Sequence, residues 1–290
     1  EAYNNIGFVA VRNHYLSQGM QDRLYPAIKN FFALPDHLKQ KYEFSELAGQ
    51  RGYTGKGKEH AKGRNTGDLK EFYHIGQELS TKELLEEGYP ANVWPEEVPE
   101  FKEAAIDAYR ALEKTGTLML RAISIYLGLR EDFFDEKIKN GNSILRPIHY
   151  FPIENPAEVP SDAVRAAEHG DINLITLLMG ASAEGLQVLR RDGKWIPITA
   201  LQDQLVVNVG DMLERLTNRK LKSTIHRVVN PPKNLMSVPR YSIPFFMHPR
   251  SEMSLAALSG CVDQETGKIW EDLSAGEFLD QRLREIGLKK

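Results

Sequence analysis

The sequence predicts an α+β fold in which N-terminal helices pack against a C-terminal β core, a double-sheet barrel or jelly roll. Two long segments before residue 130 repeat apolar residues at helical spacing. After residue 133 the chain changes to short runs rich in Val, Ile, Leu and aromatic residues, separated by turn signals. We therefore expect one folding unit with a helical support region at 1–135, a jelly-roll core at 136–250 and a closing segment at 251–290.

The N-terminal region begins with a predicted strand at 6–11. Because this strand starts almost at once and residue 1 is Glu1, we expect further sequence upstream. The first helix ends at Pro35, and the second runs from Pro99 to Leu127, with Gly128 as its C-terminal glycine. Residues 49–67 form a glycine-rich, basic loop, either a lid or substrate loop or a solvated surface loop. The apolar stripe of the first helix consists of Leu24, Ala27, Ile28, Phe31 and Phe32.

The β core is predicted from runs that match strand length and composition. The turn Arg191-Asp192-Gly193-Lys194 joins two of these runs as a hairpin, and another run ends by turning into Met212–Leu216. The closing segment ends in an amphipathic helix at Gln281–Lys290. The predicted strands are Ile144–Tyr150, Ile172–Leu178, Leu186–Leu189, Trp195–Ile198, Leu205–Val209, Thr224–Val229 and Tyr241–Phe246.

Composition narrows the class of protein. The net charge of −3 and the lack of a Lys/Arg block argue against a nucleic-acid partner, and no apolar stretch approaches the ~18 residues of a membrane span. A single cysteine, Cys261, excludes an intramolecular disulfide framework and a cysteine-built zinc site. It also fits a reducing compartment, so we expect a cytoplasmic protein. The oligomeric state is not readable from the sequence.

A metal site would have to use histidine and carboxylate ligands. The sequence His169-Gly170-Asp171 directly precedes an apolar run, and alternation along a strand would place His169 and Asp171 on one face, with Gly170 leaving room for a ligand. His226, in a later predicted strand, is the best candidate for a third ligand. Two imidazoles and one carboxylate with open positions make the facial triad of non-haem Fe(II) oxygenases. Each histidine taken alone is more often structural.

A second pair of residues indicates a site for a carboxylate. Arg240-Tyr241-Ser242 is the only Arg-x-Ser in the chain, and residues two apart on a strand share a face. A guanidinium and a hydroxyl could therefore hold one carboxylate together, although Arg240 could equally form a surface ion pair.

The order His169-x-Asp171, His226 and Arg240-x-Ser242 resembles the isopenicillin-N-synthase-like branch of the Fe(II)/2-oxoglutarate dioxygenases. The resemblance covers nearly the whole chain. Further motifs in the family's order support it: Gly7-Phe8 with Asn13-His14, Gly52-Tyr53, Asp68–Phe72, Gly185–Leu189 with Gly193–Trp195, Val207–Asp211 and Ser223–Val228.

This resemblance implies a double-stranded β-helix (jelly-roll) core and three cofactor or cosubstrate species: Fe(II), 2-oxoglutarate and O₂. It implies that His169, Asp171 and His226 ligate iron, and that Arg240 and Ser242 bind the distal carboxylate of 2-oxoglutarate. Tyr150 matches a tyrosine that assists the cosubstrate. The implied reaction couples decarboxylation of 2-oxoglutarate to oxidation of a small-molecule substrate, by default a hydroxylation. No catalytic residue beyond the metal site is implied.

The chain departs from the family pattern beside this tyrosine. Ile148 replaces the usual Asn and His149 replaces a Tyr, which places that part of the cosubstrate pocket in question. Two alternatives stay open: an oxidase of the isopenicillin-N-synthase type that does not use 2-oxoglutarate, and a non-catalytic jelly-roll binding protein.

The substrate-binding residues are unknown from the sequence. We expect them in the glycine-rich loop, in Phe72–Ile75 and in the strand after Ser242. His248 follows that strand and either faces the substrate or lies on the surface. Asn208–Asp211 is interpreted as a structural turn, and a nucleophilic role for Cys261 is disfavoured.

Overall fold

The fold is a sandwich of antiparallel sheets covered by helices, seen in a computed structural model that describes residue 3 and residues 6–59, 69–153, 164–180, 184–199, 201, 203–265 and 267–289. The first sheet has the order β1 (Phe8–Val11), β10 (Leu205–Val209), β7 (Ile175–Met179), β13 (Pro244–Met247) and β4 (Ile144–Leu145). The second has the order β6 (Ala166–His169), β11 (His226–Val228), β8 (Leu186–Leu189) and β9 (Trp195–Pro197). The third has the order β12 (Arg240–Ser242), β5 (Ile148–Tyr150), β3 (Lys70–His74) and β2 (Gly52–Thr54).

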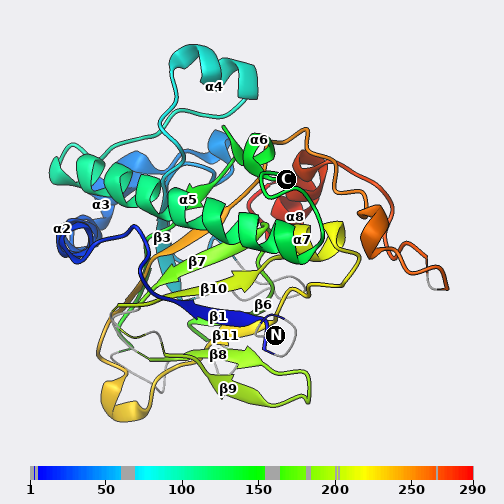
Figure 1. Ribbon diagram of the computed structural model, residues 1–290. Coiled ribbons are helices and arrows are strands. Elements are labelled where there is room, and N and C mark those ends of the chain that lie inside the picture. Colours follow the sequence, from blue (N-terminus) through cyan, green and yellow to red (C-terminus); the bar gives the residue numbers. More distant parts are fainter. Residues whose placement is uncertain are drawn as a thin grey trace.

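The helices gather on one side of the first sheet, and the second sheet lies on its other side (Figure 1). Helices α2 (Gln18–Phe32) and α5 (Glu100–Tyr126) pack together, and α5 also contacts β13 and β7. The remaining helices are α3 (Asp36–Lys39), α4 (Thr81–Glu87), α6 (Asp135–Ile138), α7 (Asp211–Leu216) and α8 (Ala275–Glu285), with 3₁₀ turns η1 (Gln40–Tyr42), η2 (Ser45–Leu47), η3 (Lys233–Leu235) and η4 (Ser259–Cys261). The predicted jelly-roll core packed against N-terminal helices is confirmed.

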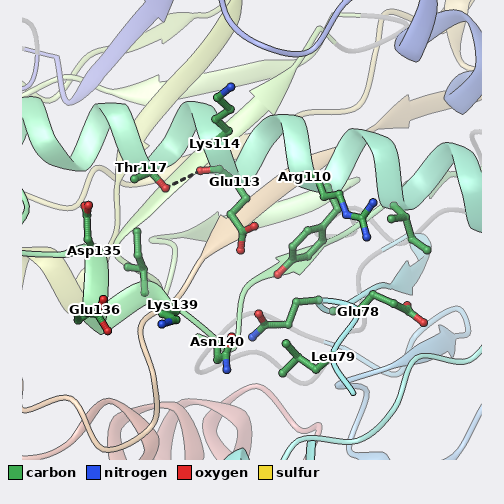
Figure 2. A pocket seen from close by; sticks show the side chains of 15 residues that line it. Glu78, Leu79, Arg110, Glu113, Lys114, Thr117, Asp135, Glu136, Lys139 and Asn140 are labelled. Atoms are coloured by element: carbon green, nitrogen blue, oxygen red, sulfur yellow. Dashed lines mark hydrogen bonds between the residues drawn. The ribbon is translucent and has the colours of Figure 1, made fainter. Parts of the chain in front are cut away.

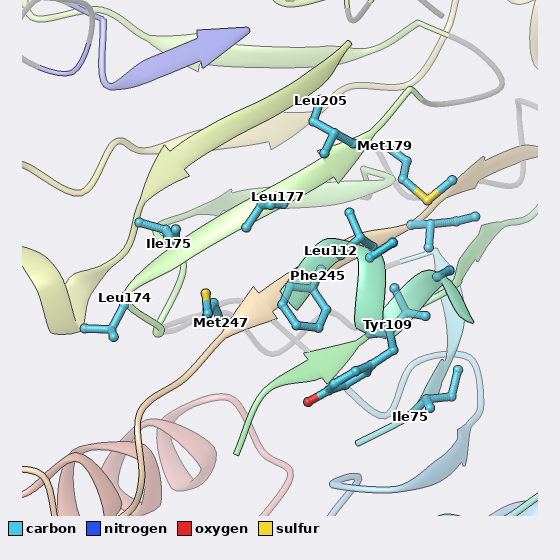
Figure 3. Close-up of a cluster of buried hydrophobic side chains, with 14 of the residues drawn as sticks. Ile75, Tyr109, Leu112, Leu174, Ile175, Leu177, Met179, Leu205, Phe245 and Met247 are labelled. Atoms are coloured by element: carbon cyan, nitrogen blue, oxygen red, sulfur yellow. The ribbon is translucent and has the colours of Figure 1, made fainter. Parts of the chain in front are cut away.

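The main hydrophobic core lies between α5 and the first sheet (Figure 3). Tyr109 and Leu112 of α5 meet Phe245 and Met247 of β13 there, and all four are nearly or fully buried. The helix approaches the sheet closely at Gly116, where an added Cβ would lie 2.5 Å from the sulfur of Met247. The other face of β13 points away from α5, and its Phe246 lines a cavity described below.

Two of the predicted strands are each divided between two sheets. The predicted strand Ile144–Tyr150 breaks at Arg146-Pro147 into β4 and β5, because Pro147 has no amide hydrogen to donate to a ladder. The predicted strand Tyr241–Phe246 divides at Ile243 into β12 and β13. At the first break the chain passes from the first sheet to the third, and at the second break it returns from the third sheet to the first.

The strand before the metal motif differs from the prediction. His169 ends β6, and β7 begins only at Ile175, so Asp171 lies between two strands instead of sharing one with His169. Residues 172–174 form a bend, and the amide of Met212 donates to the carbonyl groups of residues 172 and 173. The prediction that simple strand alternation pairs His169 with Asp171 was therefore wrong.

The helix boundaries shift by a few residues. Helix α2 begins at Gln18, where the side chain of Ser17 caps it, and α5 ends at Tyr126, followed by Gly128 with φ 73° as predicted. The closing helix begins at Ala275 instead of Gln281 and ends at Glu285. Part of the glycine-rich loop, residues 60–68, lies outside the described residues, as does Asp68 of the family motif. None of the described helices is long and apolar enough to cross a membrane.

Candidate metal centre

The structure brings His169, Asp171 and His226 together at one end of the second sheet. His226 begins β11 and stands directly opposite His169 in the β6–β11 ladder, with the two ring centroids 4.5 Å apart. One potential ligand atom from each of the three side chains lies within 4.8 Å of the others. Nε2 of His226 is 3.7 Å from Oδ1 of Asp171. This spacing fits three ligands on one side of a single metal ion.

Backbone carbonyl groups orient both imidazole rings. Nδ1 of His169 donates a hydrogen bond to the carbonyl oxygen of Ala167 at 2.6 Å, and Nδ1 of His226 donates to that of Thr224 at 3.1 Å. A carbonyl can only accept, so Nδ1 carries the proton in each ring and Nε2 keeps a lone pair for a metal. Burial, followed by the neighbouring ring of His226, lowers the pKa of His169 to about 4.

Two side chains fix the carboxylate of Asp171. Thr176 Oγ1 and Asn208 Nδ2 each donate to Oδ2 at 2.7 Å, which leaves Oδ1 directed at His226. Burial raises the pKa of Asp171, but His226, His169 and these two donors outweigh it and hold the pKa below its ordinary value. Thr176 and Asn208 are paired across β7 and β10. The sequence analysis interpreted Asn208 as a turn residue and did not predict this contact. The Val207–Asp211 motif, which contains Asn208, is the sequence feature that indicated it.

Gly170 lines the cavity beside His169 and Asp171, and it also permits close packing on its other side. A Cβ at this position would lie 2.8 Å from Oγ of Ser223 and 2.9 Å from Oδ1 of Asp211. The amide of Asp211 in turn donates to the backbone oxygen of Asp171 at 2.7 Å. The glycine therefore allows close packing of the loop that places Asp171.

The three residues predicted to bind a carboxylate lie on the third sheet. Arg240 is in register with Tyr150 and Ser242 with Ile148, and Arg240, Tyr150 and Ser242 are all at least 96% buried. The guanidinium of Arg240 lies 4.9 Å from the centre of the Tyr150 ring. The alternative that Arg240 forms an exposed ion pair is therefore excluded by its burial.

The unusual His149 belongs to a different environment. Its Nδ1 lies 2.7 Å from Oε1 of Glu71, and its ring stacks on Tyr241 at 4.8 Å between centroids. Tyr241 alternates with the two predicted carboxylate-binding residues, so His149 and Tyr241 occupy the face of the sheet opposite to Arg240. Of the two departures from the family pattern, only Ile148 shares a face with the predicted cosubstrate residues.

A cavity of about 290 Å³ opens beside His169 and Asp171. Its wall includes His248, which the sequence left either at the substrate or on the surface, and which is 94% buried here. Arg146 also lines it; the resemblance includes this residue at the start of the segment that carries Tyr150, but it gave Arg146 no role. Glu59 and Gln50 of the glycine-rich loop reach the cavity, as predicted for a substrate loop. The apolar part of the wall consists of Ile144, Ile172, Ile225, Phe246, Leu279, Leu283 and Ile286.

A second cavity, of about 480 Å³, lies between α5 and the segments 76–79 and 135–140 (Figure 2). Two charged side chains of the helix, Arg110 and Glu113, point toward it. Burial raises the pKa of Glu113, and no histidine lines this cavity among the described residues. It shares no lining residue with the cavity beside His169. It is a separate polar hollow on the helical side.

Two family models match the chain. The model described as the 2OG-Fe(II) oxygenase superfamily matches residues 142–249, and the model described as the non-haem dioxygenase in morphine synthesis N-terminal matches residues 1–97. The first range contains His169, Asp171 and His226. Together the two matches cover the first part of the helical region, up to α5, and the β core.

Relatives of known name and structure cover most of the chain. A proline hydroxylase, buaE of Petromyces alliaceus, is 31% identical over 97% of this chain and 90% of its own. A putative 2OG-Fe(II) oxygenase family protein of Caulobacter crescentus superposes with a TM-score of 0.87, 44% identity and coverage of 98% and 91%. A Neurospora crassa protein solved in complex with alpha-KG and thymine superposes with a TM-score of 0.84, 30% identity and coverage of 97% and 88%.

Proposed function

The chain belongs to the 2OG-Fe(II) oxygenase superfamily, and we propose that His169, Asp171 and His226 hold its Fe(II). As a member of this family it is an oxidoreductase that uses Fe(II), 2-oxoglutarate and O₂ to oxygenate small molecules. The observation that carries the assignment is the donor set: one nitrogen from each of two imidazoles and one carboxylate oxygen, within 4.8 Å of one another. Such a set leaves coordination positions open on one side of the metal.

The protein positions these ligands before a metal arrives. Backbone oxygens hold the two imidazoles, and Thr176 and Asn208 hold the carboxylate. Bound Fe(II) supplies the activation of O₂ that the side chains alone cannot provide. Overall, 2-oxoglutarate, O₂ and a substrate C–H bond give succinate, CO₂ and an alcohol, with one oxygen atom in succinate and one in the alcohol.

The cosubstrate is proposed to place its distal carboxylate against Arg240 and Ser242, with Tyr150 beside it. These side chains share the inward face of neighbouring strands, and a buried guanidinium binds a carboxylate with two parallel hydrogen bonds. Further support is that the Neurospora crassa relative was solved with alpha-KG, which is 2-oxoglutarate.

The substrate is proposed to be a small molecule, and no nucleic acid, because the cavity of about 290 Å³ is near the lower end of ligand-site sizes. Thymine in the Neurospora crassa relative and proline in the name of the Petromyces alliaceus relative are both small and polar. We also place the enzyme in the cytoplasm, because its one cysteine, Cys261, is free and suits a reducing compartment.

Substitution of Arg240 tests the cosubstrate site. Arg240→Lys keeps the charge but cannot make the planar two-pronged contact, so the apparent constant for 2-oxoglutarate should rise ten- to hundred-fold, which corresponds to about 1.5–3 kcal/mol. Ser242→Ala should cost about 1 kcal/mol, because one neutral donor is lost. The measurement is a 2-oxoglutarate titration of each variant at saturating iron. The control is Arg12→Lys, because Arg12 forms an exposed ion pair with Asp203.

The same titration decides between two uses of the carboxylate site. If Arg240→Lys leaves the 2-oxoglutarate titration unchanged and weakens a substrate carboxylate instead, an oxidase that does not use 2-oxoglutarate at this site replaces the proposal. If the wild-type chain binds neither iron nor 2-oxoglutarate, the non-catalytic binding protein is favoured.

A further inference from the structure

The cavity beside the proposed metal site contains a donor and an acceptor that the reaction described above does not use. They are Nη2 of Arg146 and Nε2 of His248, which both line the cavity. Neither residue ligates the metal or belongs to the proposed cosubstrate site. What they bind therefore concerns the substrate.

Arg146 is held rigidly by its surroundings. Its Nε donates to Nε2 of His74, and its Nη1 lies 3.3 Å from the carboxylate of Glu59. The guanidinium lies between two aromatic rings, 4.5 Å from the centre of Phe72 and 5.0 Å from that of Phe246. Among the described residues no hydrogen bond uses Nη2. The side chain thus presents one fixed, unused donor edge at the cavity.

His248 supplies the complementary acceptor. Its Nδ1 donates to the carbonyl oxygen of Phe246 at 3.2 Å, so Nε2 keeps a lone pair. This Nε2 is buried and has no hydrogen-bond partner in the described part of the chain. Burial lowers the pKa of His248 to about 4, which keeps the ring neutral near pH 7. A buried acceptor without a partner is costly, and a ligand with an N–H or O–H group would satisfy it.

Strand alternation puts Phe246 and His248 on the same side of the chain, and Arg146 lies beside Phe246. Phe245 and Met247 of β13 point into the core against α5 (Figure 3), so Phe246 and His248 take the opposite face. Phe246 pairs with Ile144 of β4, and Arg146 follows β4 directly, with its amide bound to the oxygen of Pro244. Arg146, Phe246 and His248 therefore line one cavity, where a single small molecule can meet both polar groups.

We propose that the substrate carries a carbonyl oxygen bound by Arg146 and a neighbouring N–H group bound by His248, as in a lactam or a cyclic imide. The Glu59 carboxylate already faces Arg146, which suits a neutral oxygen better than a second carboxylate. The apolar side chains of α8 and Phe246 would cover the rest of a small ring. This inference rests on the proposed function, because it assigns the substrate class of that same site.

The test compares matched ligands by calorimetric titration of protein loaded with Mn(II) and 2-oxoglutarate under argon. The probes are 2-pyrrolidinone and succinimide, each against its N-methyl derivative, which keeps the carbonyl and loses the N–H. We expect the N–H form to bind about ten-fold more tightly to the wild type, the effect of about one hydrogen bond. Equal binding of the N-methyl forms, or no binding by the whole set, would overturn the proposal.

Variants assign each group to its partner. His248→Phe should reduce the ten-fold preference to about one, whereas His248→Gln keeps an acceptor and should keep the preference. Arg146→Leu should weaken both members of each pair by a similar factor, because both carry the carbonyl. His37→Phe, at an exposed histidine of α3, is the matched control and should change neither. Persistence of the N–H preference in His248→Phe would contradict the role of His248.

The outcome is separable from failure of the proposed function. Mn(II) binding and 2-oxoglutarate binding are measured first, in the same samples. If they fail, the metal and cosubstrate assignments are wrong. If they hold and the N–H preference is absent, only the substrate inference is wrong.

Discussion

Asp171 is fixed from one side, by two donors on a single oxygen. Thr176→Val keeps the shape of one donor and removes its hydroxyl, so the carboxylate is free to rotate away from His226. We expect metal affinity to fall about ten- to hundred-fold with the fold retained, as is typical when an outer partner of a ligand is lost. Titration with Fe(II) under argon measures this. The control is Thr117→Val, because the hydroxyl of Thr117 donates to a carbonyl group within α5. Equal metal affinities of the Thr176 and Thr117 variants would contradict the role of Thr176.

Glu71 forms a buried network behind the cosubstrate sheet. Burial raises its pKa, but hydrogen bonds from His149, Lys39 and Tyr53 outweigh it and hold the pKa below the ordinary value. Glu71→Gln leaves Lys39 buried without this counter-charge, so the free energy of unfolding near pH 7 should fall by about 3–5 kcal/mol.

The pH dependence of the same variant follows from the direction of the shift. A depressed pKa in the folded state stabilises the protein above the unfolded value of about 4.3, and this stability is lost as the pH falls through the folded value. The difference in the free energy of unfolding between the wild type and Glu71→Gln should therefore become smaller below about pH 4. Urea unfolding measured at a series of pH values tests this. The exposed Glu46→Gln is the control. A gap that does not change with pH would show that the charge of Glu71 is not what stabilises the network.

The sequence identified the proposed ligands but not the residues that orient them. His169 and Asp171 are two residues apart in a motif, whereas Asn208 reaches Asp171 from 37 residues away. Contacts of that kind depend on which strands pair, and here they depend on the β7–β10 register. Arg146 was given no role for the same reason, because its neighbours come from β3, β13 and the glycine-rich loop.

Among the structural elements, the two long helices and most strands of the β core were predicted, but β2, β3 and β6 were not. Strand β3 contains charged Lys70 and Glu71, which a strand pattern does not favour. Both charges are buried and ion-paired, a compensation that only the three-dimensional structure supplies. Helix α4 is short and has no buried residues, so its sequence has no apolar stripe from which a helix could be predicted.

Helix α8 forms part of the cavity wall, and its first turn depends on Ser274. The side chain of Ser274 accepts from the amide of Glu277, whose carboxylate accepts from the amide of Ser274. Ser274→Ala should cost about 1 kcal/mol locally and raise amide hydrogen exchange in α8 about five-fold. Ser80→Ala, in the equivalent capping box of α4, should affect α4 alone. Unchanged exchange in α8 would mean that tertiary packing, not the cap, holds the helix.

In the whole molecule, one hydrophobic cluster joins all three predicted regions. Phe101 of α5, Phe245 of β13 and Phe278 of α8 belong to the same cluster of buried residues. The boundaries 1–135, 136–250 and 251–290 remain a prediction, and a shared core supports their folding as one unit. The helical layer also supports the cavity. Helix α5 packs against β13, and Phe246 of β13 and His248, the residue directly after it, line the cavity.

The most direct test of the metal assignment is equilibrium binding of Fe(II) under argon to the wild type and to His169→Ala, Asp171→Ala and His226→Ala, with the exposed His37→Ala as the control. We expect one tightly bound iron per chain in the wild type and the control. Each of the three ligand variants should lose it, with little change in circular dichroism because these side chains line an open site. Retention of one iron per chain with wild-type affinity by any of the three would contradict the assignment.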